Sequence, residues 1–135
     1  MKEADLNEAT TAKENTHQMI AMLMRGVIAY VEDAKSELEK EKSEEFVDYT
    51  NNAIDIIKAL QNSLDTEFGG GIAVNLDSAY SYMIGRLVES MRQVEPALMD
   101  DVIDLMAGIH ESWIAIPKNL RSASKEEVLE WAAAE

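Results

Sequence analysis

Residues 15–38 read NTHQMIAMLMRGVIAYVEDAKSEL and show the helical pattern of the chain most clearly. Apolar side chains recur in this stretch at steps of three and four residues, which is the spacing of one face of an α-helix. The members of this stripe are Ile20, Leu23, Val27, Val31, Ala34 and Leu38. Further apolar residues fill the other sides of its first half, namely Met19, Met22, Met24, Ile28 and Tyr30. We therefore expect a helix whose first half is buried on more than one side.

Capping residues on either side of this stretch predict where helices begin. Asn15-Thr16-His17-Gln18 has the form of a capping box, so the first helix is expected to begin at Asn15. Ser43, followed by two glutamates, is expected to cap a second helix. The second helix has its own apolar stripe, made of Phe46, Tyr49, Ala53, Ile57, Leu60 and Leu64.

Two more helices follow a glycine-rich segment. The three consecutive glycines at positions 69–71 predict a loop over residues 65–71, because ordering glycine in a helix costs the most backbone entropy. A third stripe follows, formed by Ile72, Leu76, Ala79, Tyr80, Met83, Leu87 and Met91. Pro96 suits the first position of a fourth helix, which Pro117 ends. The fourth stripe consists of Leu98, Val102, Leu105, Ile109, Trp113 and Ile116.

Four amphipathic helices joined by short loops predict an all-α fold, an antiparallel up-down four-helix bundle. We expect residues 1–14 to form a flexible N-terminal segment, residues 15–117 to form the bundle, and residues 118–135 to form a C-terminal tail. The tail carries a further cap at Ser124 and apolar residues that would suit a short extra helix, namely Val128, Leu129 and Trp131. Core positions are assigned to Leu60, Leu64, Ile109 and Trp113.

Composition excludes several classes of partner and compartment. The chain of 135 residues carries 26 acidic and 12 basic residues and a net charge of −14, which disfavours nucleic acid and anionic membrane surfaces. It has no cysteine, so disulfides and thiolate chemistry are excluded. The chain begins with no signal-peptide pattern, and its apolar runs are far shorter than the roughly 20 residues that span a bilayer. We therefore expect a cytosolic protein without membrane insertion.

Enzyme chemistry finds little support in the residue pattern. A carboxylate-bridged metal site in a helix bundle needs two Glu-x-x-His motifs, and only Glu14 with His17 has this spacing, since Ala107 precedes His110 by three positions. The glycine-rich segment lacks the Lys and Ser/Thr of a phosphate loop. We expect no catalytic site, no metal and no cofactor. A carboxylate-bridged metalloenzyme remains the less favoured alternative, and the eight methionines suit a surface that accepts varied apolar partners.

Residues 63–77 read SLDTEFGGGIAVNLD and resemble the signature of the flagellar export chaperone FliS family. The similarity continues through Tyr80, the run Tyr82-Met83-Ile84 and the pair Arg86-Leu87, and it covers residues 12–116. In the first helix, residues 22–26 align with the family's Met-Leu-Tyr-Asp-Gly, and the fourth helix adds Val102-Ile103-Asp104-Leu105 and Trp113. The chain departs from the family pattern at three positions, where Met24 and Arg25 replace Tyr-Asp and Gly85 replaces a common Arg.

This resemblance implies a cytosolic chaperone that binds the disordered C-terminal segment of flagellin and prevents its premature polymerisation. It also implies delivery to the flagellar export apparatus, with components of the export gate as further partners. We expect client contacts from two helices, at Ile20, Leu23, Met24 and Val27 of the first and Ile72, Leu76, Tyr80 and Met83 of the third. The alternative is a helical adaptor of the same fold that binds a different client protein. We also hypothesise that Arg25 and Gly85 lie near each other, with compensating changes of charge.

Overall fold

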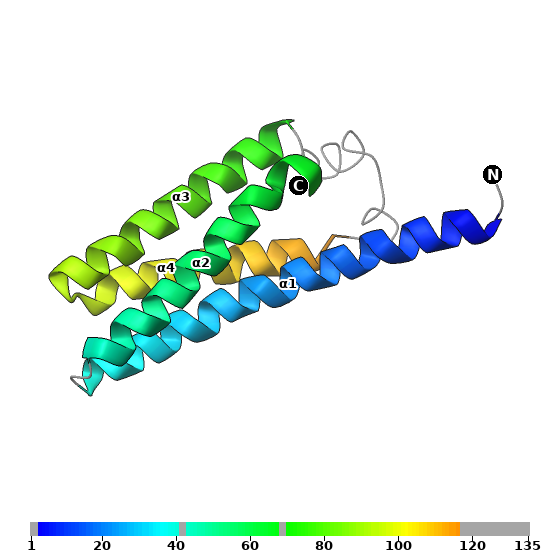
Figure 1. The fold of residues 1–135 in the computed structure, drawn as a ribbon. Helices are drawn as coiled ribbons and strands as arrows, with labels where there is room; N and C mark the ends of the chain where they lie inside the picture. The colour runs from blue at the N-terminus through cyan, green and yellow to red at the C-terminus, as the bar shows by residue number, and fades with distance from the viewer. Residues whose placement is uncertain (1–2, 41–42, 68–69, 117–135) are drawn as a thin grey trace.

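Four α-helices form an antiparallel bundle in a computed structural model of the protein (Figure 1). They are α1 (Glu3–Glu39), α2 (Ser43–Glu67), α3 (Gly70–Gln93) and α4 (Pro96–Ile114). The structure describes residues 3–40, 43–67 and 70–116, and it describes side chains over residues 16–40, 44–64 and 75–116. The predicted fold class is confirmed.

The apolar stripes meet in a single core. Members of all four stripes are fully buried, among them Val27, Ile57, Met83 and Val102. α1 packs against α2 and α4, and α3 packs against the same two helices, so α1 and α3 stand diagonally across the bundle. Of the four residues assigned to the core from the sequence, Leu60, Leu64 and Trp113 are buried, and Ile109 is partly buried against them. The helical periodicity of the sequence therefore predicts most of the core correctly.

Contacts between neighbouring helices show the antiparallel register. Tyr30 of α1 faces Tyr49 of α2, with ring centroids 6.2 Å apart. Gln61 of α2 donates hydrogen bonds to the side chains of Asp77 and Ser81 of α3, at 2.9 and 2.8 Å. These contacts pair the end of one helix with the beginning of the next, as the short connections require.

Two predicted boundaries are wrong. α1 begins at Glu3 rather than at Asn15, because residues 3–14 contain neither Gly nor Pro and are rich in the helix formers Ala and Glu. The N-terminal turns of α1 extend beyond the other helices (Figure 1). The expected loop over residues 65–71 is also too long, since α2 continues to Glu67 and α3 begins at Gly70. Glycine is tolerated in a first turn, where the backbone N–H groups lack helical partners in any case.

The predicted starts of two helices are correct, since α2 begins at Ser43 and α4 begins at Pro96. The division of the chain into residues 1–14, 15–117 and 118–135 stays a prediction. The predicted tail and its apolar residues Val128, Leu129 and Trp131 lie outside the described residues. None of the described helices contains a stretch apolar enough to cross a membrane.

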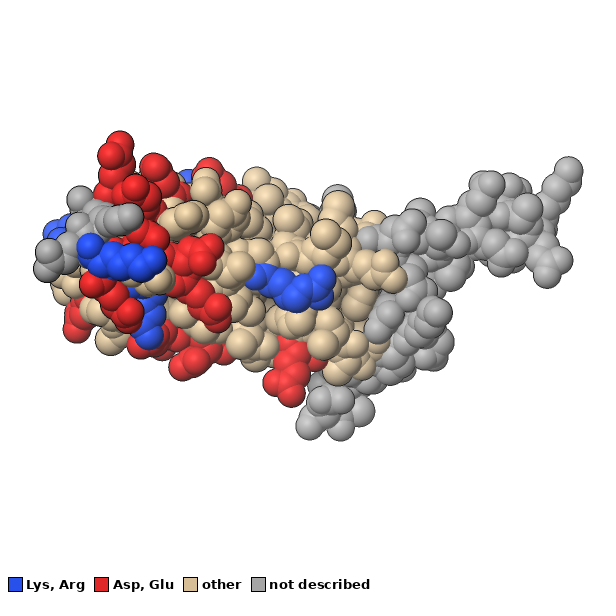
Figure 2. Space-filling model, turned by 90° about the horizontal axis from the view of Figure 1, so that it is seen from below, with Lys and Arg blue, Asp and Glu red and all other residues tan. Residues whose placement is uncertain are grey.

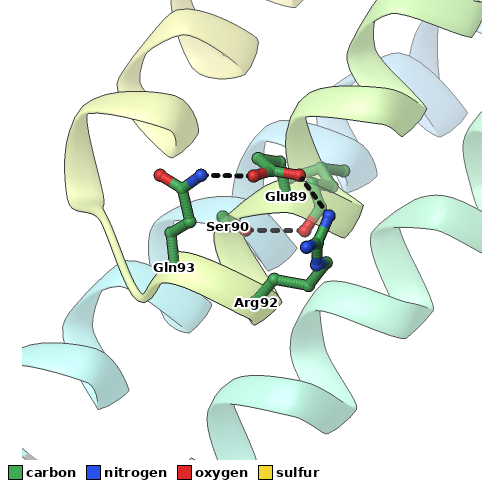
Figure 3. A network of polar contacts seen from close by, with 5 residues as sticks. Glu89, Ser90, Arg92 and Gln93 are labelled. Atoms are coloured by element: carbon green, nitrogen blue, oxygen red, sulfur yellow. Dashed lines mark hydrogen bonds and ion pairs between the residues drawn. The ribbon is translucent and has the colours of Figure 1, made fainter.

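The turn from α3 to α4 is built from a local polar network (Figure 3). Glu89 accepts hydrogen bonds from Arg92, at 3.2 Å, and from Gln93. The buried hydroxyl of Ser90 donates to the carbonyl of Leu87 at 2.7 Å, so its burial leaves no free donor. This network holds the last turn of α3 in place immediately before the chain reverses.

Candidate binding surface

The structure places five of the eight predicted client-contact residues in the core of the bundle. Ile20, Met24 and Val27 of α1 are at most 5% exposed, and Tyr80 and Met83 of α3 are at most 1% exposed. Another protein can reach these five side chains only if the bundle opens. Leu23 and Leu76 are partly buried and pack against the core, so each keeps an accessible edge. The side chain of Ile72 lies outside the described residues.

The expectation that the first half of α1 is buried on more than one side is wrong for its outer face. Met19 is 53% exposed and Met22 is 61% exposed. In the antiparallel bundle α1 packs against α2 and α4, and the side opposite the core faces solvent over the described residues. Helical spacing alone does not single out these two residues, because Met19 lies four positions before the stripe residue Leu23 and still faces solvent.

The exposed methionines lie on a stretch of α1 that carries almost no charge. Between residues 16 and 31 the only Lys, Arg, Asp or Glu is Arg25. Charged residues then crowd the last turns of α1, at Glu32, Asp33, Lys35, Glu37, Glu39 and Lys40. In Figure 2 acidic and basic side chains gather toward one end of the face, and its middle is mostly free of charge except for one basic patch. We call Met19 and Met22, with the sparsely charged stretch of residues 16–31 around them, the methionine surface.

A reciprocal contact fixes the end of α4 beside the methionine surface. The rings of His17 and Trp113 stack with centroids 4.7 Å apart and an angle of 11° between their planes. The indole Nε1–H donates to the carbonyl of His17 at 2.9 Å, and the His17 Nε2–H donates to the carbonyl of Trp113, also at 2.9 Å. Ile114, the next residue of α4, is 45% exposed, so a further apolar side chain is accessible at the same end of the bundle.

Ion pairs attach the charged ends of the helices to one another. Lys35 donates to Asp100 of α4 at 2.7 Å, and this hydrogen bond raises the pKa of Lys35. The guanidinium of Arg86 lies 3.1 Å from a carboxylate oxygen of Asp101 and donates to the hydroxyl of Tyr82 at 2.9 Å. Exposed pairs of this kind contribute little to stability, because solvent screens them, and their main effect is to set the register of α4 against its neighbours.

The polar groups show no arrangement for metal chemistry over the described part of the chain. No three His, Asp or Glu side chains there lie close enough together to hold a metal ion. His110 lies beside Arg25, with 3.5 Å between Nε2 and Nη1. The side chain of Glu14, the other half of the Glu-x-x-His motif, lies outside the described residues.

The three departures from the family pattern occupy different environments. Met24 is fully buried, so it packs in the core, while Arg25 extends to His110 of α4. A side chain at Gly85 would meet no atom within 4 Å at its Cβ position. The hypothesis that Arg25 and Gly85 compensate each other therefore gains no support from their contacts.

These features define an all-α bundle that presents a sparsely charged, methionine-bearing surface beside a densely charged end. The sequence profile of a family described as flagellar protein FliS matches residues 2–120. The chain belongs to this family. A flagellar secretion chaperone FliSB of Pseudomonas aeruginosa is 37% identical over 109 residues, which cover 81% of this chain and 86% of the relative.

Two further relatives have similar coverage. The flagellar secretion chaperone FliS of Vibrio cholerae is 30% identical over 112 residues, covering 83% of this chain and 82% of the relative. That of Salmonella typhimurium is 33% identical over 107 residues, covering 78% of this chain and 79% of the relative. The resemblance predicted from the sequence is confirmed: the chain is a member of the flagellar export chaperone FliS family.

Proposed function

We propose that this protein binds the disordered C-terminal segment of flagellin in the cytosol, prevents its premature polymerisation and helps to deliver it to the flagellar export apparatus. The observation that carries this proposal is the family match over residues 2–120, together with relatives that are secretion chaperones. Holding a client in this way requires no catalysis, so we propose no enzymatic activity for the chain.

The exposed apolar side chains support a role in binding a polypeptide. A segment that folds as it binds can lay an apolar helix face along a bundle and bury a large area, at the cost of becoming ordered. Met19 and Met22 already stand in solvent on α1, and thioether side chains adapt to partners of different shape. We propose that they contact the client.

The residues predicted as contacts from the sequence divide into two groups under this proposal. Leu23 and Leu76 keep accessible edges and are proposed to touch the client directly. The buried members, Ile20, Met24, Val27, Tyr80 and Met83, are proposed to shape the bundle beneath, and they contact a client only if binding opens the helices. Ile72 keeps its proposed role as a contact of α3.

Calorimetry with a synthetic C-terminal flagellin peptide from the same organism tests the proposal. We expect saturable binding with a Kd of tens of micromolar or tighter, which corresponds to a standard binding free energy more favourable than about −6 kcal/mol. Absence of binding under these conditions would favour the alternative, an adaptor of the same fold with a different client protein.

A pair of matched variants then locates the surface. Met22→Glu places a carboxylate on the methionine surface and should weaken peptide binding at least about tenfold, because the charge must be desolvated under the client. Val88→Glu makes the same change at a residue of α3 that is 43% exposed, and it should leave the Kd unchanged. Equal effects of the two substitutions would remove the methionine surface from the proposal.

A further inference from the structure

The methionines of the described chain differ sharply in exposure. Met24, Met83, Met99 and Met106 are fully buried, and Met91 is partly buried against the core. Met19 and Met22 are more than half exposed. One residue type therefore occurs both in the core and on the open face of a single helix.

Exposure controls the chemistry of the thioether. In a two-electron oxidation by a hydroperoxide, the sulfur attacks the terminal peroxide oxygen and the O–O bond breaks. The proton of the transferred oxygen moves to the departing oxygen, so a sulfoxide and an alcohol are formed, or a sulfoxide and water when the oxidant is hydrogen peroxide. The sulfur is oxidised and the peroxide is reduced. Hydrogen peroxide must reach the sulfur, so Met19 and Met22 can react in the folded protein, while the fully buried methionines require opening of the bundle. Methionine sulfoxide is reversible, because dedicated reductases restore the thioether.

The position of the two methionines gives such an oxidation a local effect. They stand three residues apart on α1 and are therefore neighbours on its surface. Their surroundings between residues 16 and 31 carry no Lys, Arg, Asp or Glu except Arg25, so two sulfoxide dipoles would change the polarity of this face substantially. The core would be unaffected, since neither side chain fills it.

We propose that Met19 and Met22 form a reversible oxidation site for hydroperoxides, at which conversion to sulfoxides turns the methionine surface polar while the bundle stays folded. The oxidised surface binds apolar polypeptide more weakly, and this last consequence rests on the proposed function. The chain contains no cysteine, so these two methionines would make the binding of a client polypeptide sensitive to oxidant.

Peptide mapping of the full chain after timed exposure to hydrogen peroxide tests the site itself. Tryptic cleavage after Lys13 and Arg25 releases one peptide that contains Met19, Met22 and the buried Met24, so the third residue is an internal control. Fragment ions should show sulfoxide at Met19 and Met22 at least about tenfold faster than at Met24, and the difference should vanish in urea. Equal rates at the three residues in the folded protein would overturn the site.

Two readouts test the change of surface. Oxidised protein should keep its circular dichroism spectrum and Tm, leave a hydrophobic-interaction column earlier, and bind the flagellin peptide several-fold more weakly. The double variant Met19→Leu with Met22→Leu should show none of these losses after the same treatment. Unchanged column retention of the doubly oxidised protein would reject the surface effect. A peptide that fails to bind before oxidation would count against the proposed function and not against the site.

Discussion

Tyr80 is the largest side chain among those fully buried in the core, and its burial raises the pKa of its phenol to about 12. The unfolded chain ionises this group near a pKa of 10. Between pH 10 and 12 the unfolded state therefore binds fewer protons than the folded state, and stability must fall as pH rises. Tyr80 therefore stays protonated in the bundle, and the free energy of unfolding falls at alkaline pH.

Tyr80→Phe should remove this pH dependence. From pH 8 to pH 11 the free energy of unfolding should fall by about 1.4 kcal/mol more in the wild type than in the variant. The reason is that at pH 11 the phenol is mostly ionised in the unfolded chain and still mostly protonated in the bundle. Urea unfolding at both pH values measures the difference. Lys35 also has a raised pKa and loses its stabilising charge in the alkaline range, but this loss is common to both proteins and cancels. Parallel decline of the two proteins would show that Tyr80 ionises as readily in the bundle as in the unfolded chain.

Val94 adopts a backbone conformation that its side chain disfavours. It lies immediately after α3 with a φ of 53°, and its N–H donates to the carbonyl of Ser90 at 2.8 Å. This is the left-handed position that commonly ends a helix and is most often glycine, because a β-branched residue is strained there. The strain is compatible with an abrupt reversal, since Pro96 begins α4 two residues later.

Val94→Gly should therefore raise the free energy of unfolding, although glycine also increases the entropy of the unfolded chain. Relief of left-handed strain, about 1–2 kcal/mol, exceeds the glycine penalty of about 0.5–1 kcal/mol, so a net gain of about 0.5–1 kcal/mol is expected. Val94 is 55% exposed, so little packing is lost. Val94→Ala, which keeps the Cβ atom, is the control and should gain less. A glycine variant less stable than the alanine variant in urea would refute the argument.

Among the contacts between helices, one aromatic pair far apart in sequence joins α4 to α1 through both its rings and its backbone carbonyls. His17 and Trp113 combine ring stacking with two reciprocal hydrogen bonds to each other's backbone. Both are buried. Sequence periodicity placed Trp113 in the core but assigned His17 only to a helix cap, because the contact joins residues separated by 96 positions.

Substituting both rings by phenylalanine should reveal the coupling between α1 and α4. Trp113→Phe loses one donor and part of the ring, and should cost about 1–3 kcal/mol. His17→Phe removes the other donor, and the double variant should be less destabilised than the sum by about 1 kcal/mol, as measured by urea unfolding. Tyr49→Phe, which changes the ring pair between α1 and α2 instead, should combine additively with Trp113→Phe. Additivity of the His17 and Trp113 changes would show that their contact contributes nothing beyond the separate side chains.

At the scale of the whole molecule, the net charge of −14 is unevenly distributed. Acidic residues crowd the last turns of α1 and the first half of α4, at Glu32, Asp33, Glu37, Glu39, Asp100, Asp101 and Asp104. The methionine surface lies on the less charged part of α1. This segregation allows one end of the molecule to keep it dispersed while the other remains apolar enough to bind a polypeptide.

The four helices of the described chain, their stripes and the family all follow from the sequence alone, because the helical period and the family's residue pattern are local features. Leu60 and Leu64 could be assigned to the core on that basis. The start of α1 was missed because a good cap at Asn15 competes with strong helix formers before it, and a local rule cannot weigh one against the other.

Which apolar side chains remain accessible depends on how the helices pack, and the sequence does not show it. Met19, Met22 and Met24 are indistinguishable in type and adjacent in sequence, yet two are exposed and one is fully buried. The burial of each methionine depends on where α2 and α4 pack against α1. The burial of the predicted contacts Tyr80 and Met83 depends on the same two helices, which also pack against α3. Periodicity identifies a face that seeks burial, but the arrangement of neighbouring helices determines how far around α1 the burial extends.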